Sequence, residues 1–197
     1  MTRIKICGIT NLEDAISAVQ LGADELGFNF YPRSPRYISP ENAAEITSLL
    51  PPDVVKVGVF VNESVDAICE IGVKSRLNKI QLHGDENPLF IREVRDRSGL
   101  EVIKAYRIHS NIKTEDIIRC DSPFVLLDGY SANERGGTGE PFDWDIAKEI
   151  VRFRPTSVYL AGGLSADNVA EAIRLVQPFA VDACSRLESK PGKKHGA

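Results

Sequence analysis

The sequence lacks cysteines spaced for a metal or redox motif. Its four cysteines, Cys7, Cys69, Cys120 and Cys184, are widely scattered, and none belongs to a CxxC pair. The pattern therefore predicts neither a disulfide framework nor a zinc site. Each cysteine has to be considered by itself.

Long apolar runs and an excess of positive charge are also missing. No window approaches the roughly 20 apolar residues of a membrane span, and the apolar run that follows Met1 is too short for a signal peptide core. The net charge of −4 argues against nucleic-acid binding, which needs a basic surface. We expect a soluble cytoplasmic protein that holds an anionic substrate with local groups.

What the sequence does contain is a regular alternation of short apolar runs and amphipathic stretches. The runs at 54–61 and 124–127 do not alternate between apolar and polar residues, which is typical of parallel strands covered on both faces. Eight strands are predicted at residues 4–7, 26–30, 54–61, 79–82, 102–106, 124–128, 157–161 and 179–183.

Helix signals lie between these strands. Asn11, Ser39 and Ser165 predict helix starts, and Gly22 predicts a helix end. Further helices are expected at 63–71, 88–96, 114–120 and 143–151. Eight such units favour a TIM-type (β/α)8 barrel, built as one domain over residues 1–197, and an open doubly wound sheet is the alternative.

The last barrel helix is not visible in the sequence. The twelve residues 186–197 that follow Ser185 include Pro191-Gly192-Lys193-Lys194, a loop pattern. We predict a barrel that lacks most or all of its eighth helix and is less stable than a complete one. Either the chain is truncated or a partner covers the seam, so a monomer and a homodimer are both expected.

Two polar residues end predicted strands at the barrel mouth, where such barrels have their active sites. Cys7 ends the first strand and Asp128 ends the sixth. Alone, Cys7 is typical of a buried small side chain and Asp128 of a helix cap. Together they are the base and the acid that a proton-shuffling isomerase needs.

Small-residue loops follow the last two strands. Gly162 and Gly163 come after the seventh strand and Ser185 after the eighth, where barrels commonly bind phosphate through backbone N–H groups. An ordinary tight turn is the alternative, but the two loops together favour a phosphate site. A third glycine-rich stretch, at 136–139, is either a lid or a plain connection.

Two further polar residues lie in mouth loops. Arg36 follows the second strand, where its guanidinium could hold a carboxylate with two hydrogen bonds, although loop arginines are often only solvated. His83 follows the fourth strand and could contact substrate, while a hydrogen-bonded structural role is the simpler interpretation.

Several short motifs run in a specific order along essentially the whole chain. They are Lys5-Ile6-Cys7-Gly8-Ile9-Thr10, Gly27-Phe28-Asn29-Phe30 with Ser34-Pro35-Arg36-Tyr37, Val57-Gly58-Val59-Phe60-Val61-Asn62, Gln81-Leu82-His83-Gly84, Leu127-Asp128, Gly136-Gly137-Thr138-Gly139 with Phe142-Asp143-Trp144, and Ala161-Gly162-Gly163-Leu164. In this order and spacing the chain resembles the phosphoribosylanthranilate isomerase family of tryptophan biosynthesis.

The resemblance implies an Amadori rearrangement of N-(5-phosphoribosyl)anthranilate to the corresponding 1-deoxyribulose 5-phosphate, an aldose–ketose isomerisation without metal or cofactor. It implies that Asp128 is the general acid and Cys7 the general base, with help from Lys5 in a direction that the sequence leaves open. Arg36 would hold the anthranilate carboxylate. Backbone groups around Gly163 and Ser185 would hold the phosphate.

The chain departs from the family pattern after the eighth strand. The family commonly has Ser-Ser-Gly-Val-Glu there, whereas this chain has Cys184-Ser185-Arg186-Leu187-Glu188. Arg186 therefore replaces a glycine and either adds a charge contact to the phosphate or distorts the amide geometry. Related phosphosugar barrels, such as indoleglycerol phosphate synthase, are disfavoured by the Cys7 and Asp128 pair. A non-catalytic phosphometabolite-binding barrel remains the other alternative.

Overall fold

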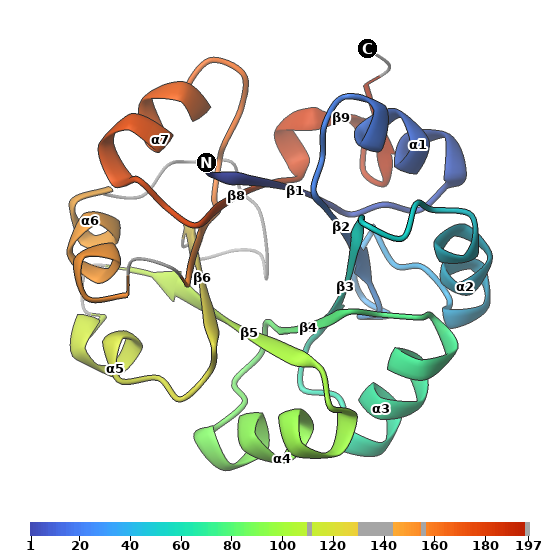
Figure 1. Cartoon of the computed structure of the whole chain (residues 1–197), viewed down its shortest axis with the longest axis horizontal. Helices are drawn as coiled ribbons and strands as arrows, with labels where there is room; N and C mark the ends of the chain where they lie inside the picture. The colour runs from blue at the N-terminus through green and yellow to red at the C-terminus, as the bar shows by residue number, and fades with distance from the viewer. Residues whose placement is uncertain (110–111, 130–143, 155–156, 196–197) are drawn as a thin grey trace.

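The structure, a computed structural model, describes residues 1–109, 112–129, 144–154 and 157–195. Eight parallel strands form a closed barrel in the order β1 to β8, with the helices in a ring outside it (Figure 1). The strands are β1 (Arg3–Cys7), β2 (Glu25–Asn29), β3 (Val55–Phe60), β4 (Lys79–Leu82), β5 (Glu101–Ile108), β6 (Phe124–Gly129), β7 (Val158–Leu160) and β8 (Ala180–Ala183). Each of the eight predicted strands is confirmed, with bounds within two residues.

The barrel is closed by pairing between the first and last strands. Lys5 of β1 lies opposite Glu25 of β2 on one side and opposite Asp182 of β8 on the other. Most residues of β2 to β7 are buried, because side chains fill the barrel on one face and the helices cover the other. The predicted barrel is therefore confirmed and the open sheet is excluded.

Helix starts follow the capping signals in two of the three cases. The Asn11 side chain accepts a hydrogen bond from Asp14 N at 2.9 Å, and the Ser39 side chain accepts one from Asn42 N at 3.2 Å. The helices are α1 (Leu12–Gln20), α2 (Pro40–Ser48), α3 (Val65–Lys74), α4 (Pro88–Ser98), α5 (Thr114–Ile118), α6 (Trp144–Phe153) and α7 (Val169–Val176).

The predicted start of the last of these helices at Ser165 is wrong. Helix α7 begins only at Val169, because Asn168 ties the preceding turn together. Its side chain accepts a hydrogen bond from Ser165 N at 2.9 Å and donates one to Gly163 O at 2.9 Å. Residues 165–168 thus extend the loop that follows β7.

The segment after β8 forms a hairpin rather than the plain loop expected there. A 3₁₀ turn (η1, Ser185–Leu187) leads into β9 (Glu188–Lys190), which pairs antiparallel with β10 (Lys193–Lys194). The described residues after β8 contain no α-helix, as predicted. In the ring of helices this segment, which includes β9, lies beside α1 (Figure 1).

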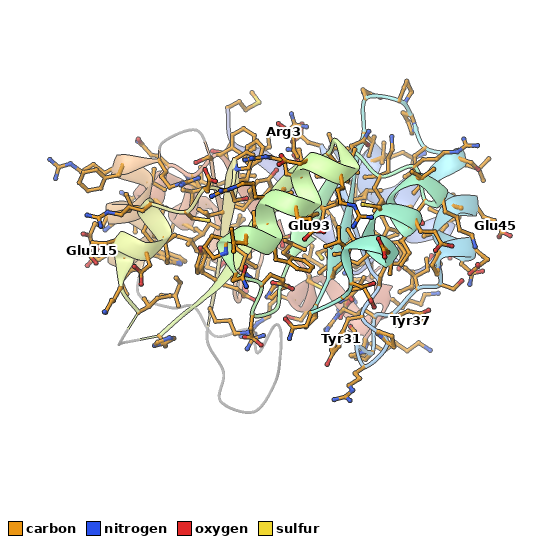
Figure 2. All side chains as sticks on the ribbon, turned by 90° about the horizontal axis from the view of Figure 1, so that it is seen from below. Arg3, Tyr31, Tyr37, Glu45, Glu93 and Glu115 are labelled. Atoms are coloured by element: carbon orange, nitrogen blue, oxygen red, sulfur yellow. The ribbon has the colours of Figure 1, made fainter. Side chains whose placement is uncertain are left out.

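The two ends of the barrel differ in character. The end where the strands begin is closed by a buried network in which Lys79 Nζ donates to Tyr159 OH at 2.9 Å, and Tyr159 OH donates to Glu25 at 2.9 Å. Figure 2 shows Arg3 at this end and Tyr31 and Tyr37, from the loop after β2, at the opposite end. Within the described residues, no helix has the length and apolar character needed to cross a membrane.

Candidate active site

A cavity of about 410 Å³ opens at the end of the barrel where the strands finish. It lies where the parallel strands point their carboxyl ends, as expected for this architecture. All the site residues proposed from the sequence line it, namely Cys7, Arg36, His83, Asp128, Gly162, Gly163 and Ser185. The structure therefore brings these residues together around one space, while their individual roles stay predictions.

Cys7 is held at the end of β1 in surroundings that favour its thiolate. A Cβ atom on Gly27, in the neighbouring strand, would lie 2.7 Å from Cys7 Sγ, so only glycine leaves room for the thiol. A hydrogen bond from the Cys184 thiol lowers the pKa of Cys7 well below its usual value. Burial acts in the opposite direction, and the positive charges of Lys5 and Lys194 lower the pKa further.

Asp128 ends β6 and is buried beside a histidine. His83 Nε2 lies 3.4 Å from Asp128 Oδ2, and His83 Nδ1 lies 3.0 Å from Gln81 Nε2. Gln81, at the end of β4, also lines the cavity. The helix-cap interpretation of Asp128 finds no support here, because the carboxylate faces a cavity and a histidine.

Sequence reasoning missed Asp182, an acidic residue of the cavity wall. Asp182 lies in β8 and accepts a hydrogen bond at 2.9 Å from Nζ of Lys5, whose side chain is fully buried. This gives the direction of Lys5, which points to β8. Burial raises the pKa of Asp182 to about 7 against the opposing charge of Lys5. In the sequence, the signal for this pair is that Lys5 and Asp182 are opposite charges in two predicted strands whose other residues are apolar.

Arg107 is a second missed residue. It lies in β5 opposite Asp128 of β6, one residue beyond the strand end expected from the sequence. Its Nη2 lies 3.5 Å from His83 O, and its Nε is buried without a hydrogen-bond partner among the described residues. An arginine with a buried, unused donor on a cavity wall is suited to bind a polar ligand group.

The loop after β7 is shaped by two glycines with positive φ. Gly162 has φ +80° and Gly163 has φ +70°. A Cβ on Gly162 would clash with the backbone N of Gly129 and lie 3.0 Å from Asp128 Oδ1. The loop thus packs directly against the end of β6. Gly163 and Ser185, the latter from the neighbouring loop after β8, line the same cavity.

Arg36 is neither free nor solvated, since it is paired with a carboxylate from the C-terminal hairpin. Its Nε lies 3.0 Å from both carboxylate oxygens of Glu188, and its Nη2 lies 2.8 Å from Oε2. Although burial alone would lower the pKa of Arg36, its bond to Glu188 raises it above the usual value. The guanidinium is therefore a fixed cation on the cavity wall.

Arg186 lies away from this site. It is exposed and lines a separate groove between α1 and the C-terminal segment. Among the described residues that line the active-site cavity, Arg186 does not occur. Its two expected effects, a charge contact to the phosphate or a distorted amide geometry, stay predictions.

Two expectations concern parts of the site that the structure does not decide. The glycine-rich stretch 136–139 lies outside the described residues. Within the described residues, no group of three or more His, Cys, Asp or Glu side chains is placed to hold a metal ion. The expectation of a reaction without metal or cofactor stays a prediction.

The arrangement combines groups that suit proton transfer on an anionic sugar. A thiol with a lowered pKa lies on β1, and a carboxyl group lies on β6 of the same mouth. A fixed guanidinium and a pair of glycine- and serine-containing loops flank the cavity. Such a site can bind a ligand that carries negative charge at both ends. Its thiol and carboxyl groups can transfer protons to and from that ligand.

Comparisons with known proteins agree with this geometry. Residues 4–197 match the family model described as N-(5'phosphoribosyl)anthranilate (PRA) isomerase. The N-(5'-phosphoribosyl)anthranilate isomerase of Trichlorobacter lovleyi is 50% identical over 98% of this chain and 92% of its own. The crystal structure of phosphoribosyl anthranilate isomerase from Thermotoga maritima is 44% identical, with a TM-score of 0.92 over 100% of this chain and 94% of that chain.

A further solved structure carries a ligand. It is described as phosphoribosyl anthranilate isomerase in complex with reduced 1-(o-carboxyphenylamino)-1-deoxyribulose 5-phosphate. It is 43% identical, with a TM-score of 0.86 over 100% of this chain and 93% of that chain.

Proposed function

Because the chain belongs to the N-(5'-phosphoribosyl)anthranilate isomerase family, we propose that its cavity performs the family's reaction with Cys7 as base and Asp128 as acid. The protein is an isomerase of tryptophan biosynthesis that converts N-(5-phosphoribosyl)anthranilate to 1-(2-carboxyphenylamino)-1-deoxyribulose 5-phosphate. The observation that carries the residue roles is the meeting of Cys7, with its lowered pKa, and Asp128 at one cavity.

The first step opens the sugar ring. Asp128 gives its proton to the furanose ring oxygen while the bond from that oxygen to C1 breaks. The nitrogen lone pair of the anthranilate forms a double bond to C1, so the product is a protonated imine. Asp128 suits this task because it is buried at the rim of the cavity, where a sugar oxygen can reach it.

The second step moves hydrogen from C2 to C1. The Cys7 thiolate takes the proton from C2, and the electron pair of that C–H bond forms a C1–C2 double bond as the imine nitrogen becomes neutral. The resulting enolamine loses its hydroxyl proton and gains a proton at C1, which gives the ketone. The imine is the internal electron sink, so the step needs no cofactor.

Two ends of the substrate carry negative charge, and we assign a different part of the cavity wall to each. Arg36 lies near the loop after β2 and would bind the anthranilate carboxylate. Backbone groups of Gly162 and Gly163, together with Ser185, would bind the phosphate on the β7 and β8 side. Stretched between them, the sugar would lie across Cys7, His83 and Asp128.

The roles are tested by turnover of enzymatically generated phosphoribosylanthranilate, followed through the loss of its anthranilate fluorescence. We expect Cys7→Ala and Asp128→Ala each to lower kcat by at least 10²-fold, because each removes a proton-transferring group. Circular dichroism and binding of a reduced product analogue serve as controls for folding. A folded Cys7→Ala chain that keeps its kcat would exclude Cys7 as the base.

The comparisons do not support the two alternatives to the isomerase that the sequence left open. The family match over nearly the whole chain decides against a related phosphosugar barrel and against a barrel that only binds. The solved 3-hexulose-6-phosphate synthase of Salmonella typhimurium is only 12% identical at a TM-score of 0.72, so this likeness shows a common fold alone. The cytoplasmic location and the choice between monomer and homodimer stay predictions, the latter open to a native mass measurement.

A further inference from the structure

The C-terminal hairpin reaches back to the barrel mouth and places a buried carboxylate directly behind Arg36. The side chain of Glu188, at the start of β9, is 3% exposed, and that of Arg36 is 17% exposed. The two residues are 152 positions apart in the chain. Arg36 lines the cavity, whereas Glu188 does not occur among the described residues that line it. Glu188 therefore approaches the guanidinium from the side away from the substrate space.

The hydrogen bonds occupy one particular edge of the guanidinium. A guanidinium has five N–H donors and can pair with a carboxylate either through Nε and one terminal nitrogen or through its two terminal nitrogens. Glu188 takes the first edge, with contacts to Nε at 3.0 Å and to Nη2 at 2.8 Å. No described residue accepts a hydrogen bond from Nη1, so the edge formed by Nη1 and Nη2 is left for a second carboxylate.

Glu188 is itself fixed by a second cation. Lys194 Nζ, from β10, lies 3.1 Å from Glu188 Oε1 and donates to Cys7 O at 2.6 Å. Gly192 N donates to Glu188 Oε1 at 3.3 Å. The hairpin thereby ties the arginine that faces the aromatic end of the substrate to the backbone of the proposed base.

The charge balance of this group leaves a positive charge for the substrate. Glu188 alone would neutralise Arg36 and repel an incoming carboxylate. Lys194 compensates the charge of Glu188, so Arg36, Glu188 and Lys194 together carry a formal charge of +1. Hydrogen bonds from Arg36 and the charge of Lys194 hold the pKa of Glu188 below its usual value although burial opposes this, so Glu188 stays ionised.

We propose that Glu188 is a positioning residue that holds Arg36 with its Nη1–Nη2 edge toward the cavity and so selects substrates whose aromatic amine carries a carboxylate. The inference rests on the proposed function, because it takes Arg36 as the ligand of the anthranilate carboxylate. An arginine that is already ordered loses less conformational entropy when it binds, and its bidentate geometry is set in advance. Glu188 acts through Arg36 and does not contact the substrate.

The experiment compares two ligands that differ only in the carboxylate. They are reduced 1-(o-carboxyphenylamino)-1-deoxyribulose 5-phosphate and the same compound with an unsubstituted phenyl ring. Calorimetry gives the Kd of each for the full chain and for Glu188→Gln, Glu188→Asp and Arg36→Lys. We expect Glu188→Gln to weaken binding of the carboxylated ligand about tenfold or more and that of the phenyl ligand less than twofold. KM should rise more than kcat falls.

Glu188→Asp and one further variant, Ser189→Ala, separate positioning from a structural role of the hairpin. Glu188→Asp keeps the charge that the buried site needs but sets it one methylene farther from Arg36, so its ratio of the two Kd values should lie between those of the parent and Glu188→Gln. Ser189→Ala removes the bond from Ser189 Oγ to Lys193 O in the same hairpin and should leave the ratio unchanged.

The outcomes that overturn the proposal are distinct from a failure of the site assignment. If Glu188→Gln weakens both ligands equally, Glu188 serves only to hold the hairpin, and the proposal is wrong. If Arg36→Lys abolishes the preference for the carboxylated ligand while Glu188→Gln keeps it, Arg36 needs no positioning by Glu188. If Arg36→Lys keeps the full preference, a point charge at position 36 suffices and no positioned guanidinium is needed, which overturns the proposal and leaves the roles of Cys7 and Asp128 untouched.

Discussion

A second thiol accompanies the proposed base at the barrel mouth. Cys184 stands where the family resemblance placed a serine, and its hydrogen bond with Cys7 raises its own pKa well above the usual value, with burial as the next cause. The hydrogen bond thus favours the thiolate form of Cys7 over that of Cys184. A donor hydrogen bond to a thiolate is strong because the acceptor is charged.

This pair gives a prediction at the residue scale. Replacing Cys184 with Ala removes the donor, so the pKa of Cys7 should rise and its thiolate fraction at pH 7 should fall. The rate of Cys7 alkylation by iodoacetamide, measured against pH by mass spectrometry of the Cys7 peptide, should shift its midpoint upward. The alkaline shift should appear on the acidic limb of kcat/KM as well.

The matched control for this prediction is Cys184→Ser, which keeps a donor at the same position. Its alkylation profile should stay closer to that of the parent than the profile of Cys184→Ala. Equal midpoints for the parent and Cys184→Ala would show that Lys5 and Lys194, not Cys184, set the pKa of Cys7.

Single residues differ in how well the sequence reveals them. Cys7 and Asp128 could be found because each directly follows an apolar run, and the fold then dictates which end of the barrel they occupy. Asp182 and Glu188 could not be found in this way. Their partners Lys5 and Arg36 lie 177 and 152 residues away, and no local pattern records such a contact.

At the scale of elements, the end of β6 and the loop after β7 are coupled through a single glycine. Gly162 packs against the backbone of Gly129 and against the carboxylate of Asp128, so the position of the proposed acid depends on the loop that would hold the phosphate. Phosphate binding and acid placement are thereby parts of one packed unit.

Gly162→Ala tests this coupling. The alanine would have an unfavourable φ of +80°, which costs about 1 kcal/mol of stability. Its Cβ would also displace Gly129, so we expect kcat to fall about tenfold or more. Gly22→Ala is the control, because Gly22 has φ +96° and nothing within 4 Å of the added Cβ. In urea denaturation it should lose only the part of the stability that comes from the left-handed backbone, and it should keep its kcat. Equal kinetics for the two variants would contradict the coupling.

Elements were more predictable than their connections. The eight strands are visible because burial on both faces demands continuous apolar runs, and the starts of α1 and α2 are visible because their capping bonds are local. The predicted start of α7 is wrong because the Asn168 side chain forms its hydrogen bonds with Ser165 and Gly163 in the preceding loop. The hairpin of β9 and β10 cannot be predicted from the sequence because strands of three and two residues are too short to show a periodic signal.

At the scale of the whole molecule, the barrel is closed by hydrogen bonds but not fully covered. Between α1 and the C-terminal segment lies a groove of about 340 Å³ whose lining includes Ile4, Ile6, Leu21 and His195, the last described residue. Ile4 is 40% exposed and Leu21 is 70% exposed. In barrels of this type that have a helix after the eighth strand, that helix covers this seam.

A helix attached after residue 197 should therefore stabilise the chain. An amphipathic segment that buries two apolar side chains in the groove would contribute roughly 3 kcal/mol, which corresponds to a rise of about 6–12 °C in Tm for a protein of this size. Calorimetry of the parent and the extended chain measures this difference. A segment of equal length with its apolar residues changed to serine should leave Tm where it was. Parallel native mass measurements decide whether a second copy already covers the groove. If the parent is a dimer that the extension turns into a monomer, the helix and the partner chain compete for the same surface. An unchanged Tm in a monomeric parent would show that the exposed groove costs the barrel little stability.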